Sequence, residues 1–200
     1  MADWFIKNYA VITAVAAALC LIALYFAIKA TSRHNKRYRE EEEKIIHLKK
    51  LKEKFSDLSP EIIYGAEKSE LLQGVALHYQ LILQKKEDME KEFSLLPLEA
   101  KYIYTLDIFS SEDGTLSAFY KNNGNILREL FIPALKEIGE NSLAEIAYPL
   151  SRMYDPNDEE ASIGSNIIEK ADREFSEIYN REEFALKAAE YIIKEAQSFK

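Results

Sequence analysis

The hydrophobic positions of this chain divide it into one long apolar run and a series of shorter amphipathic segments. Residues 9–28 carry no charge over 20 positions, and Thr13 is their one clearly polar side chain. A helix of this length rises about 30 Å, the hydrocarbon thickness of a bilayer. The run therefore predicts a single transmembrane helix that follows a short N-terminal tail, so that residues 1–30 form one segment.

A cleaved signal peptide is the alternative for this run, but Asp3 offsets Lys7 before it, and the run exceeds the usual apolar region of about 7–15 residues. Five basic residues follow the run before the first acid: Lys29, Arg33, Lys36, Arg37 and Arg39. Positive charge beside a span marks the cytoplasmic side. We expect a single-pass protein of the cell membrane, with its N-terminus outside and its C-terminal domain in the cytoplasm.

Residues 31–58 predict a charged juxtamembrane helix, because they contain no Gly or Pro and many strong helix formers. Apolar side chains recur at Ile45, Leu48, Leu51 and Phe55, so one face is apolar. This face fits either a short coiled-coil stalk or packing against the following domain, and the second is favoured because barely two heptads are present.

Residues 59–200 predict an all-α fold, a compact multi-helix domain without β alternation. Ser59-Pro60 suits a helix start, and Gly65 and Gly74 predict two helices or a kink. Further helices are expected after Pro97, over 126–139 and 142–154, and over 165–179 and 181–198. Pro133 predicts a kink or an earlier boundary, Gly139 a helix end, and residues 155–162 a polar loop.

Charge changes sign along the chain, which has a net charge of −8. Residues 1–58 carry 11 Lys/Arg and 7 Asp/Glu, a net of +4, and residues 59–200 carry 15 and 27, a net of −12. The basic part suits an anionic lipid surface, whereas the acidic part disfavours direct nucleic-acid binding and favours a basic protein partner. The simpler interpretation is that the acidic surface only keeps the domain soluble.

Catalytic and metal-binding motifs are missing from the sequence. It contains neither a P-loop nor GxGxxG, its three histidines are scattered, and its single cysteine lies in the predicted span. Residues 155–166 resemble a calcium loop superficially, but Glu160 and Asn166 occupy the positions that need Gly and Glu. We therefore predict no catalytic, cofactor or metal site and no evident small-molecule ligand.

A short aromatic segment between two turn signals offers the candidate partner-binding residues. The turns are 112–115 and 122–125, and most of the chain's aromatic side chains are expected in the core. Aromatic side chains near the turns could instead line a groove, since exposed aromatic patches mark binding surfaces. The candidates are Glu112, Asp113, Phe119, Tyr120 and Asn123.

Three stretches resemble the DNA-mimic protein 19-like domain family. They are SSEDGTLSAFYKNNGN at 110–125, ALKEIGENSLAEI at 134–146 and ADREFSEIYNREEFALKAAEYI at 171–192. The likeness covers residues of about 60–198 and leaves out the predicted membrane anchor. It implies an all-α acidic domain, and the family name implies an acidic surface that imitates DNA phosphates to occupy a DNA-binding protein.

The resulting hypothesis is a membrane-anchored, non-enzymatic interaction module that presents an acidic helical surface to the cytoplasm. One alternative is an immunity or antitoxin-like protein that neutralises a basic toxin. Another is an enzyme whose site is built from dispersed acids and tyrosines, for which a pocket containing Glu112, Asp113 and Tyr120 would be the sign.

Overall fold

The computed structural model describes residues 38–39, 41–111, 115–153 and 165–199. The chain divides into two compact units, residues 1–49 and residues 50–200. The described residues contain helices and no strand, so the all-α prediction is confirmed for that part of the chain.

The first unit is described only over its last residues, which are helical and exposed. Ile45 and Leu48 of the predicted apolar face are 54% and 39% exposed, whereas Leu51 and Phe55 belong to the core of the second unit and are 1% exposed each. The predicted span at 9–28 lies outside the described residues. None of the described helices combines the length and hydropathy needed to cross a bilayer.

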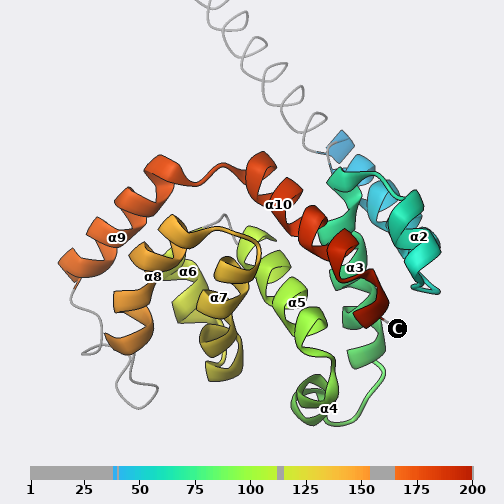
Figure 1. Cartoon of the computed structure of the whole chain (residues 1–200), viewed down its shortest axis with the longest axis horizontal. Helices are drawn as coiled ribbons and strands as arrows, with labels where there is room; N and C mark the ends of the chain where they lie inside the picture. Colours follow the sequence, from blue (N-terminus) through green and yellow to red (C-terminus); the bar gives the residue numbers. More distant parts are fainter. Residues whose placement is uncertain (1–37, 40, 112–114, 154–164, 200) are drawn as a thin grey trace, which may run out of the picture. The chain divides into compact units, whose positions relative to one another are not determined.

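The second unit is a helical domain, drawn in Figure 1. Its helices are α2 (Pro60–Gly65), α3 (Lys68–Leu83), α4 (Met89–Leu95), α5 (Leu98–Ser111), α6 (Leu116–Asn122), α7 (Asn125–Glu137), α8 (Asn141–Met153), α9 (Ser165–Ile178), α10 (Arg181–Lys194) and the 3₁₀ turn η1 (Ala196–Ser198).

Side-chain caps and glycine explain where several of these helices begin and end. The Ser59 hydroxyl accepts a hydrogen bond from the Ile62 N–H at 3.4 Å, as the sequence predicts for an N-cap before Pro60. Asn180 caps α10 in the same way, accepting from the N–H groups of Glu182 and Glu183. Gly139 ends α7 with φ of +82°, a conformation that an L side chain rarely adopts.

The two helix-interior prolines do not end their helices. α7 continues through Pro133 to Glu137, so the earlier boundary that Pro133 allowed is wrong, and α8 continues through Pro149. Gly65 does close α2, but α3 passes through Gly74 without a break. The apolar partners of these helices therefore outweigh the local cost of each unfavourable residue.

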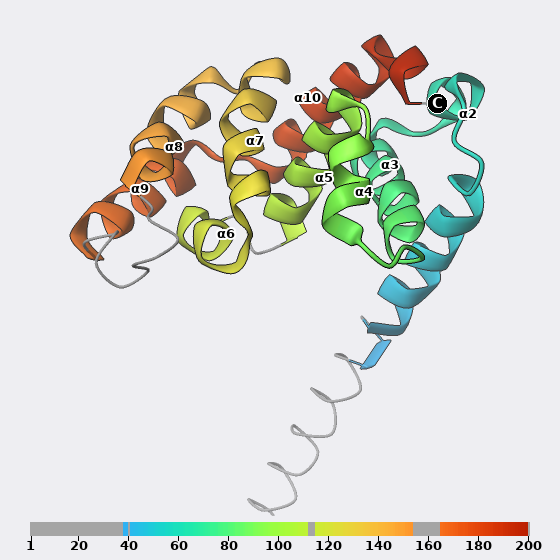
Figure 2. The ribbon, with the colours of Figure 1, turned by 90° about the horizontal axis from the view of Figure 1, so that it is seen from below.

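Four helices pack side by side in a row, α3 on α5, α5 on α7 and α7 on α8 (Figure 2). The last two helices then cover this row, because α10 packs on α3 and α5 while α9 packs on α6 and α8. The buried core runs through all of them. Elements from both ends of the domain thus meet in its middle.

Phe109 of α5 occupies the centre of that core. Its ring lies 4.7 Å from Phe131, 5.4 Å from Phe175 and 6.0 Å from Phe184, measured between ring centroids. Phe119 and Tyr179 complete the set at 5.8 and 5.5 Å. These rings come from α6, α7, α9, α10 and the α9–α10 connection, so one side chain joins five parts of the domain.

Gly74 is required because α3 packs closely on the ring of Phe55. A Cβ atom at position 74 would lie 2.3 Å from the Phe55 Cε2 atom. We expect Gly74→Ala to lower the free energy of unfolding by a net of about 1–2 kcal/mol, since the overpacking cost exceeds the gain in helix propensity. Urea denaturation measures the difference.

Gly65→Ala is the matched control, because a Cβ at position 65 meets nothing within 4 Å. It should leave stability unchanged or raise it slightly. Equal effects of the two substitutions would contradict the close approach of Phe55 to α3.

Candidate functional site

The residues singled out by the sequence are largely structural in the described part of the chain. Glu112 and Asp113 lie outside the described residues. The side chains of Phe119 and Tyr120 are 0% exposed. Asn123 follows α6, is partly buried, and donates from Nδ2 to the Phe119 carbonyl at 2.9 Å.

Phe119 and Tyr120 are held inside by ring contacts. Phe119 lies 4.5 Å from Phe131 between centroids, and its ring meets that of Tyr120 edge-on at 5.6 Å. The Tyr120 hydroxyl lies 3.5 Å from the Ala147 carbonyl, and burial raises the pKa of this phenol. These two side chains therefore stabilise the domain from within, and its exposed chemistry comes from other residues.

The negative charges of three carboxylates from different parts of the domain act on the phenol of Tyr191. They are Glu99 of α5, Glu137 of α7 and Glu195 at the end of α10. Burial raises the pKa of Tyr191, and the negative charges of all three glutamates raise it further. We call Glu99, Glu137 and Glu195 the carboxylate surface.

A second tyrosine reports the same negative field. Burial raises the pKa of Tyr102 on α5, and the charges of Glu137 and Glu99 add to the rise. Tyr79 of α3 is 4% exposed, and burial together with Glu99 raises its pKa to about 12. The carboxylate surface therefore acts on phenols from three helices, α3, α5 and α10.

The lysines that form ion pairs in the described part of the domain bind glutamates other than Glu99 and Glu137. Lys187 bridges Glu140 and Glu183 at 3.1 and 3.0 Å, and Lys68 pairs with Glu190 at 3.0 Å. Within the carboxylate surface, Glu195 contacts Lys194 at 3.0 Å. Neither Glu99 nor Glu137 forms an ion pair with any residue in the described ranges, so their charge is not neutralised locally.

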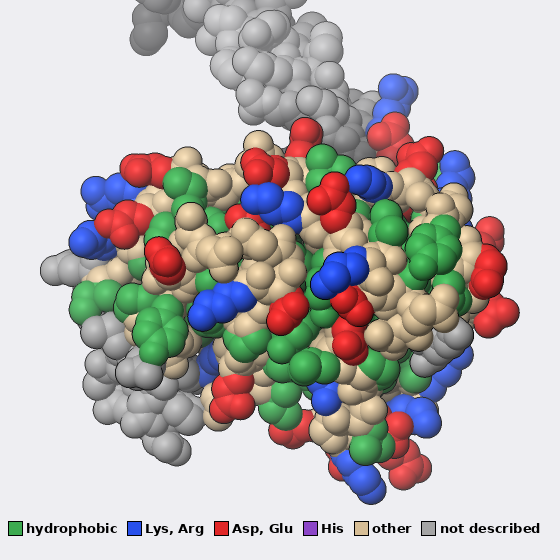
Figure 3. Space-filling model, in the orientation of Figure 1, with side chains coloured by type: hydrophobic (Ala, Val, Ile, Leu, Met, Phe, Trp, Pro, Cys, Tyr) green, Lys and Arg blue, Asp and Glu red, His purple; other side chains and the backbone are tan. Residues whose placement is uncertain are grey.

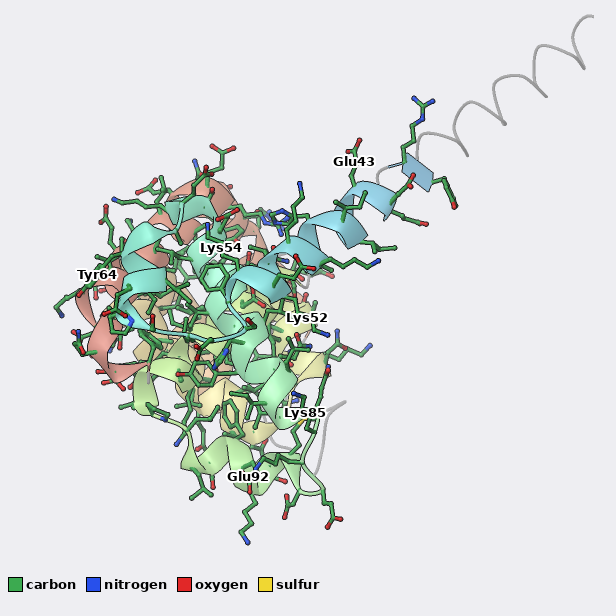
Figure 4. All side chains as sticks on the ribbon, turned by 90° about the vertical axis from the view of Figure 1, so that its right-hand side faces the viewer. Glu43, Lys52, Lys54, Tyr64, Lys85 and Glu92 are labelled. Atoms are coloured by element: carbon green, nitrogen blue, oxygen red, sulfur yellow. The ribbon has the colours of Figure 1, made fainter. Side chains whose placement is uncertain are left out.

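Further carboxylates are exposed and form no ion pair with other described residues. They are Glu67, Glu87, Glu90, Glu129, Glu145, Glu169, Glu177 and Glu182. Acidic and basic side chains alternate over the face shown in Figure 3 rather than forming one continuous patch. On the side shown in Figure 4, exposed Lys52 and Lys85 lie on the same surface as Glu92.

Asp107 is a separate titratable group, partly buried on α5. Burial raises the pKa of this carboxyl to about 7, and the nearby Arg181 at the start of α10 opposes the rise. The group therefore changes charge near neutral pH. It adjoins the aromatic core through its own helix, two residues before Phe109.

No group of three or more His, Cys, Asp or Glu side chains in the described residues is arranged to hold a metal ion. The described cavities are lined by few acids. One of about 530 Å³ lies among α6, α7 and α8, and one of about 410 Å³ lies between α4 and the start of α7. The first contains Tyr120, as the enzyme hypothesis requires, but its acidic lining residue is Glu129.

The fold and these sites define a small all-α domain with a single aromatic core and a surplus of surface carboxylates. The model of the DMP19-like protein family matches residues 94–195. The chain belongs to this family, which confirms the resemblance seen in the sequence over that range. No curated protein and no solved structure gives a significant match.

The raised pKa of Asp107 makes stability depend on pH. The folded protein holds this proton more tightly than the unfolded chain, so its contribution to stability falls as pH rises from about 4 to about 7. Asp107→Asn removes this loss. We expect its stability relative to wild type to improve by about 2–3 kcal/mol between pH 5 and pH 8.

Urea denaturation at both pH values measures the change, with Glu169→Gln, at an exposed position of α9, as the control. The control should follow wild type. Parallel pH profiles of Asp107→Asn and wild type would contradict a raised carboxyl pKa at this position.

Proposed function

We propose that this protein is a membrane-anchored, non-enzymatic interaction module that presents an acidic helical surface to the cytoplasm and binds a basic protein partner. Membership of the DMP19-like family supports an interaction role. The observation that carries the proposal is the carboxylate surface, since the charges of Glu99 on α5, Glu137 on α7 and Glu195 at the end of α10 act together on one buried tyrosine, Tyr191.

Electrostatics make such a surface suitable for a basic partner. Residues 59–200 have a net charge of −12. A field of this sign accelerates encounter with a positively charged protein, and the effect weakens when salt shortens the Debye length to below about 10 Å. Binding removes water from a few carboxylates, and charge-assisted hydrogen bonds from Arg or Lys of the partner at matching positions offset this free-energy cost.

DNA mimicry is the narrower form of this proposal. It requires carboxylates held like phosphates on rigid elements, so that a DNA-binding protein accepts them in place of its own ligand. Helices joined through a packed core meet the requirement for rigidity. DNA mimicry would be supported if duplex DNA displaced the bound partner from this protein.

An immunity or antitoxin-like role uses the same surface against a basic toxin, and a toxin gene beside this one would favour it. The enzyme alternative depends on Glu112 and Asp113 joining Tyr120 in one pocket. Glu112, Asp113 and Asn123 remain candidate contributors to partner binding.

The membrane anchor in this proposal is the apolar run at 9–28, with the basic residues 29–39 at the cytoplasmic lipid surface. The helical residues before position 50 then connect the anchor to the acidic domain. Anchoring raises the local concentration of the domain for any partner that is itself at the membrane.

The carboxylate surface predicts salt-dependent capture of a basic partner. Full-length protein in detergent, carrying Glu99→Gln, Glu137→Gln and Glu195→Gln together, should retain membrane-extract proteins roughly tenfold more weakly than wild type at low salt. Quantitative mass spectrometry of the bound fractions at about 50 mM and about 500 mM salt measures the loss.

The matched control removes the same charge elsewhere, through Glu87→Gln, Glu169→Gln and Glu177→Gln, three exposed positions without ion pairs to described residues. It should retain the salt-sensitive partner. Retention that ignores salt, or an equal loss in both triple variants, would argue against a specific surface. Competition by duplex DNA then distinguishes mimicry from other acidic recognition.

The orientation is tested with reporters fused to the C-terminus of the full chain. A fluorescent protein that matures only in the cytoplasm should be active, and an alkaline phosphatase fusion should be inactive. Deleting residues 9–28 should move the protein from the membrane fraction to the soluble fraction. An active phosphatase fusion would show that the C-terminal domain lies outside the cytoplasm. Unchanged fractionation after the deletion would show that residues 9–28 do not anchor the protein.

A further inference from the structure

The cavity among α6, α7 and α8 combines aromatic walls with polar groups. Its volume of about 530 Å³ lies in the range of small-molecule sites. Tyr148, which is 45% exposed, supplies aromatic surface, whereas Tyr120 also lines the cavity but is buried. Asn125, Arg128 and Ser151 supply polar atoms. None of the three glutamates of the carboxylate surface lines this cavity, so a ligand site here is independent of the proposed function.

Arg128 is the charged side chain that the fold buries at this cavity. It is 8% exposed, whereas Thr105 and Ser110, the other buried polar residues in the described part, are uncharged. Its Nη1 donates to the Asn125 Oδ1 atom at 3.3 Å, a contact along the same helix that orients the guanidinium. A guanidinium carries five N–H donors in a planar fork, and this geometry suits a carboxylate or a phosphate.

The position of Arg128 adds to the preference for an anion. It is the fourth residue of α7, near the positive end of the helix, where a cation is normally unfavourable. Gly124 is the N-cap and provides no capping side chain. The arginine and the helix start therefore contribute positive potential to the same end of the cavity, which Asn125 also lines.

The opposite chemistry is present on the same helix. Pro133 has no N–H group, so the carbonyl of Glu129 lacks the donor that residue 133 would supply in a regular helix. Both residues line the cavity. A ligand held at Arg128 can thus place a donor of its own against this wall.

We propose that the cavity among α6, α7 and α8 binds a small organic anion, whose carboxylate or phosphate pairs with Arg128 while its body packs against Tyr148. The domain as a whole is acidic, which opposes anion binding at its surface. A recessed cation is therefore needed for such a ligand, and Arg128 provides it.

The test uses full-length protein in detergent and three fluorinated probes of one size, 4-fluorobenzoate, 4-fluorophenyl phosphate and 4-fluorobenzamide. Fluorine NMR line broadening over concentrations up to about 10 mM measures saturable binding. We expect binding of the benzoate, the phosphate or both, and none of the uncharged amide. The two anions distinguish a carboxylate ligand from a phosphate ligand.

Arg128→Gln should weaken anion binding by about tenfold or more, because a charged hydrogen-bond partner is lost. Arg173→Gln, which removes the same charge from an exposed position of α9, should leave binding unchanged. Tyr148→Ala keeps Arg128 and removes a wall that is 45% exposed, so it should weaken binding in a protein with normal circular dichroism and thermal unfolding even if Arg128→Gln misfolds.

Three results would overturn the proposal. They are the absence of saturable anion binding to wild type, equal binding of the amide, and unchanged affinity in both folded Arg128→Gln and Tyr148→Ala. Equal weakening by Arg173→Gln would show a non-specific charge effect and would also overturn it.

Discussion

The contact of Phe109 with rings from five parts of the chain is the constraint on which the domain depends. A ring in this position is effective because each neighbour meets it tilted or edge-on, at centroid distances between 4.7 and 6.0 Å. The chain segments that meet there are separated by up to 75 positions, from Phe109 to Phe184. Local helix propensity cannot order such segments relative to one another, so burial of these rings has to do so.

This core gives the surface its rigidity. Glu99 is ten residues before Phe109 on the same helix, and Glu137 is six residues after Phe131 on α7. Glu195 follows α10, which the core holds through Phe184. The carboxylate surface is thus carried by helices that are already packed, and a partner does not have to order them on binding.

The sequence predicted the helices well where their signals are local. Ser59-Pro60, Pro97 and Gly139 act on the backbone beside them, and the helices begin or end there. The two helices expected from Gly65 and Gly74 are confirmed, with the break at Gly65 rather than Gly74. The earlier helix boundary that Pro133 allowed is wrong, because the contacts that hold α7 together come from residues distant in the chain. The sequence also could not place the aromatic candidates, because an aromatic pair such as Phe119 and Tyr120 occurs both in exposed grooves and in buried cores. In the structure both side chains are buried. Only the positions of Phe109 and Phe131 decide between them.

The carboxylate surface could not be predicted from the sequence either, because its three glutamates are spread over 97 residues.

The arrangement of charge distinguishes the two candidate sites physically. In the carboxylate surface Glu137 is exposed while Glu99 and Glu195 are partly buried. Their charges act over a distance, which suits the capture of a large basic protein in a salt-dependent way. A guanidinium that is recessed and oriented by Asn125 acts only at contact, but there its effect is strong because less water screens it. The aromatic core connects the two, since Phe131 packs on both Phe109 and Tyr120, whose phenol lines the cavity. A domain of this size can therefore carry a surface for one class of partner and a cavity for another, because a single core fixes the geometry of both.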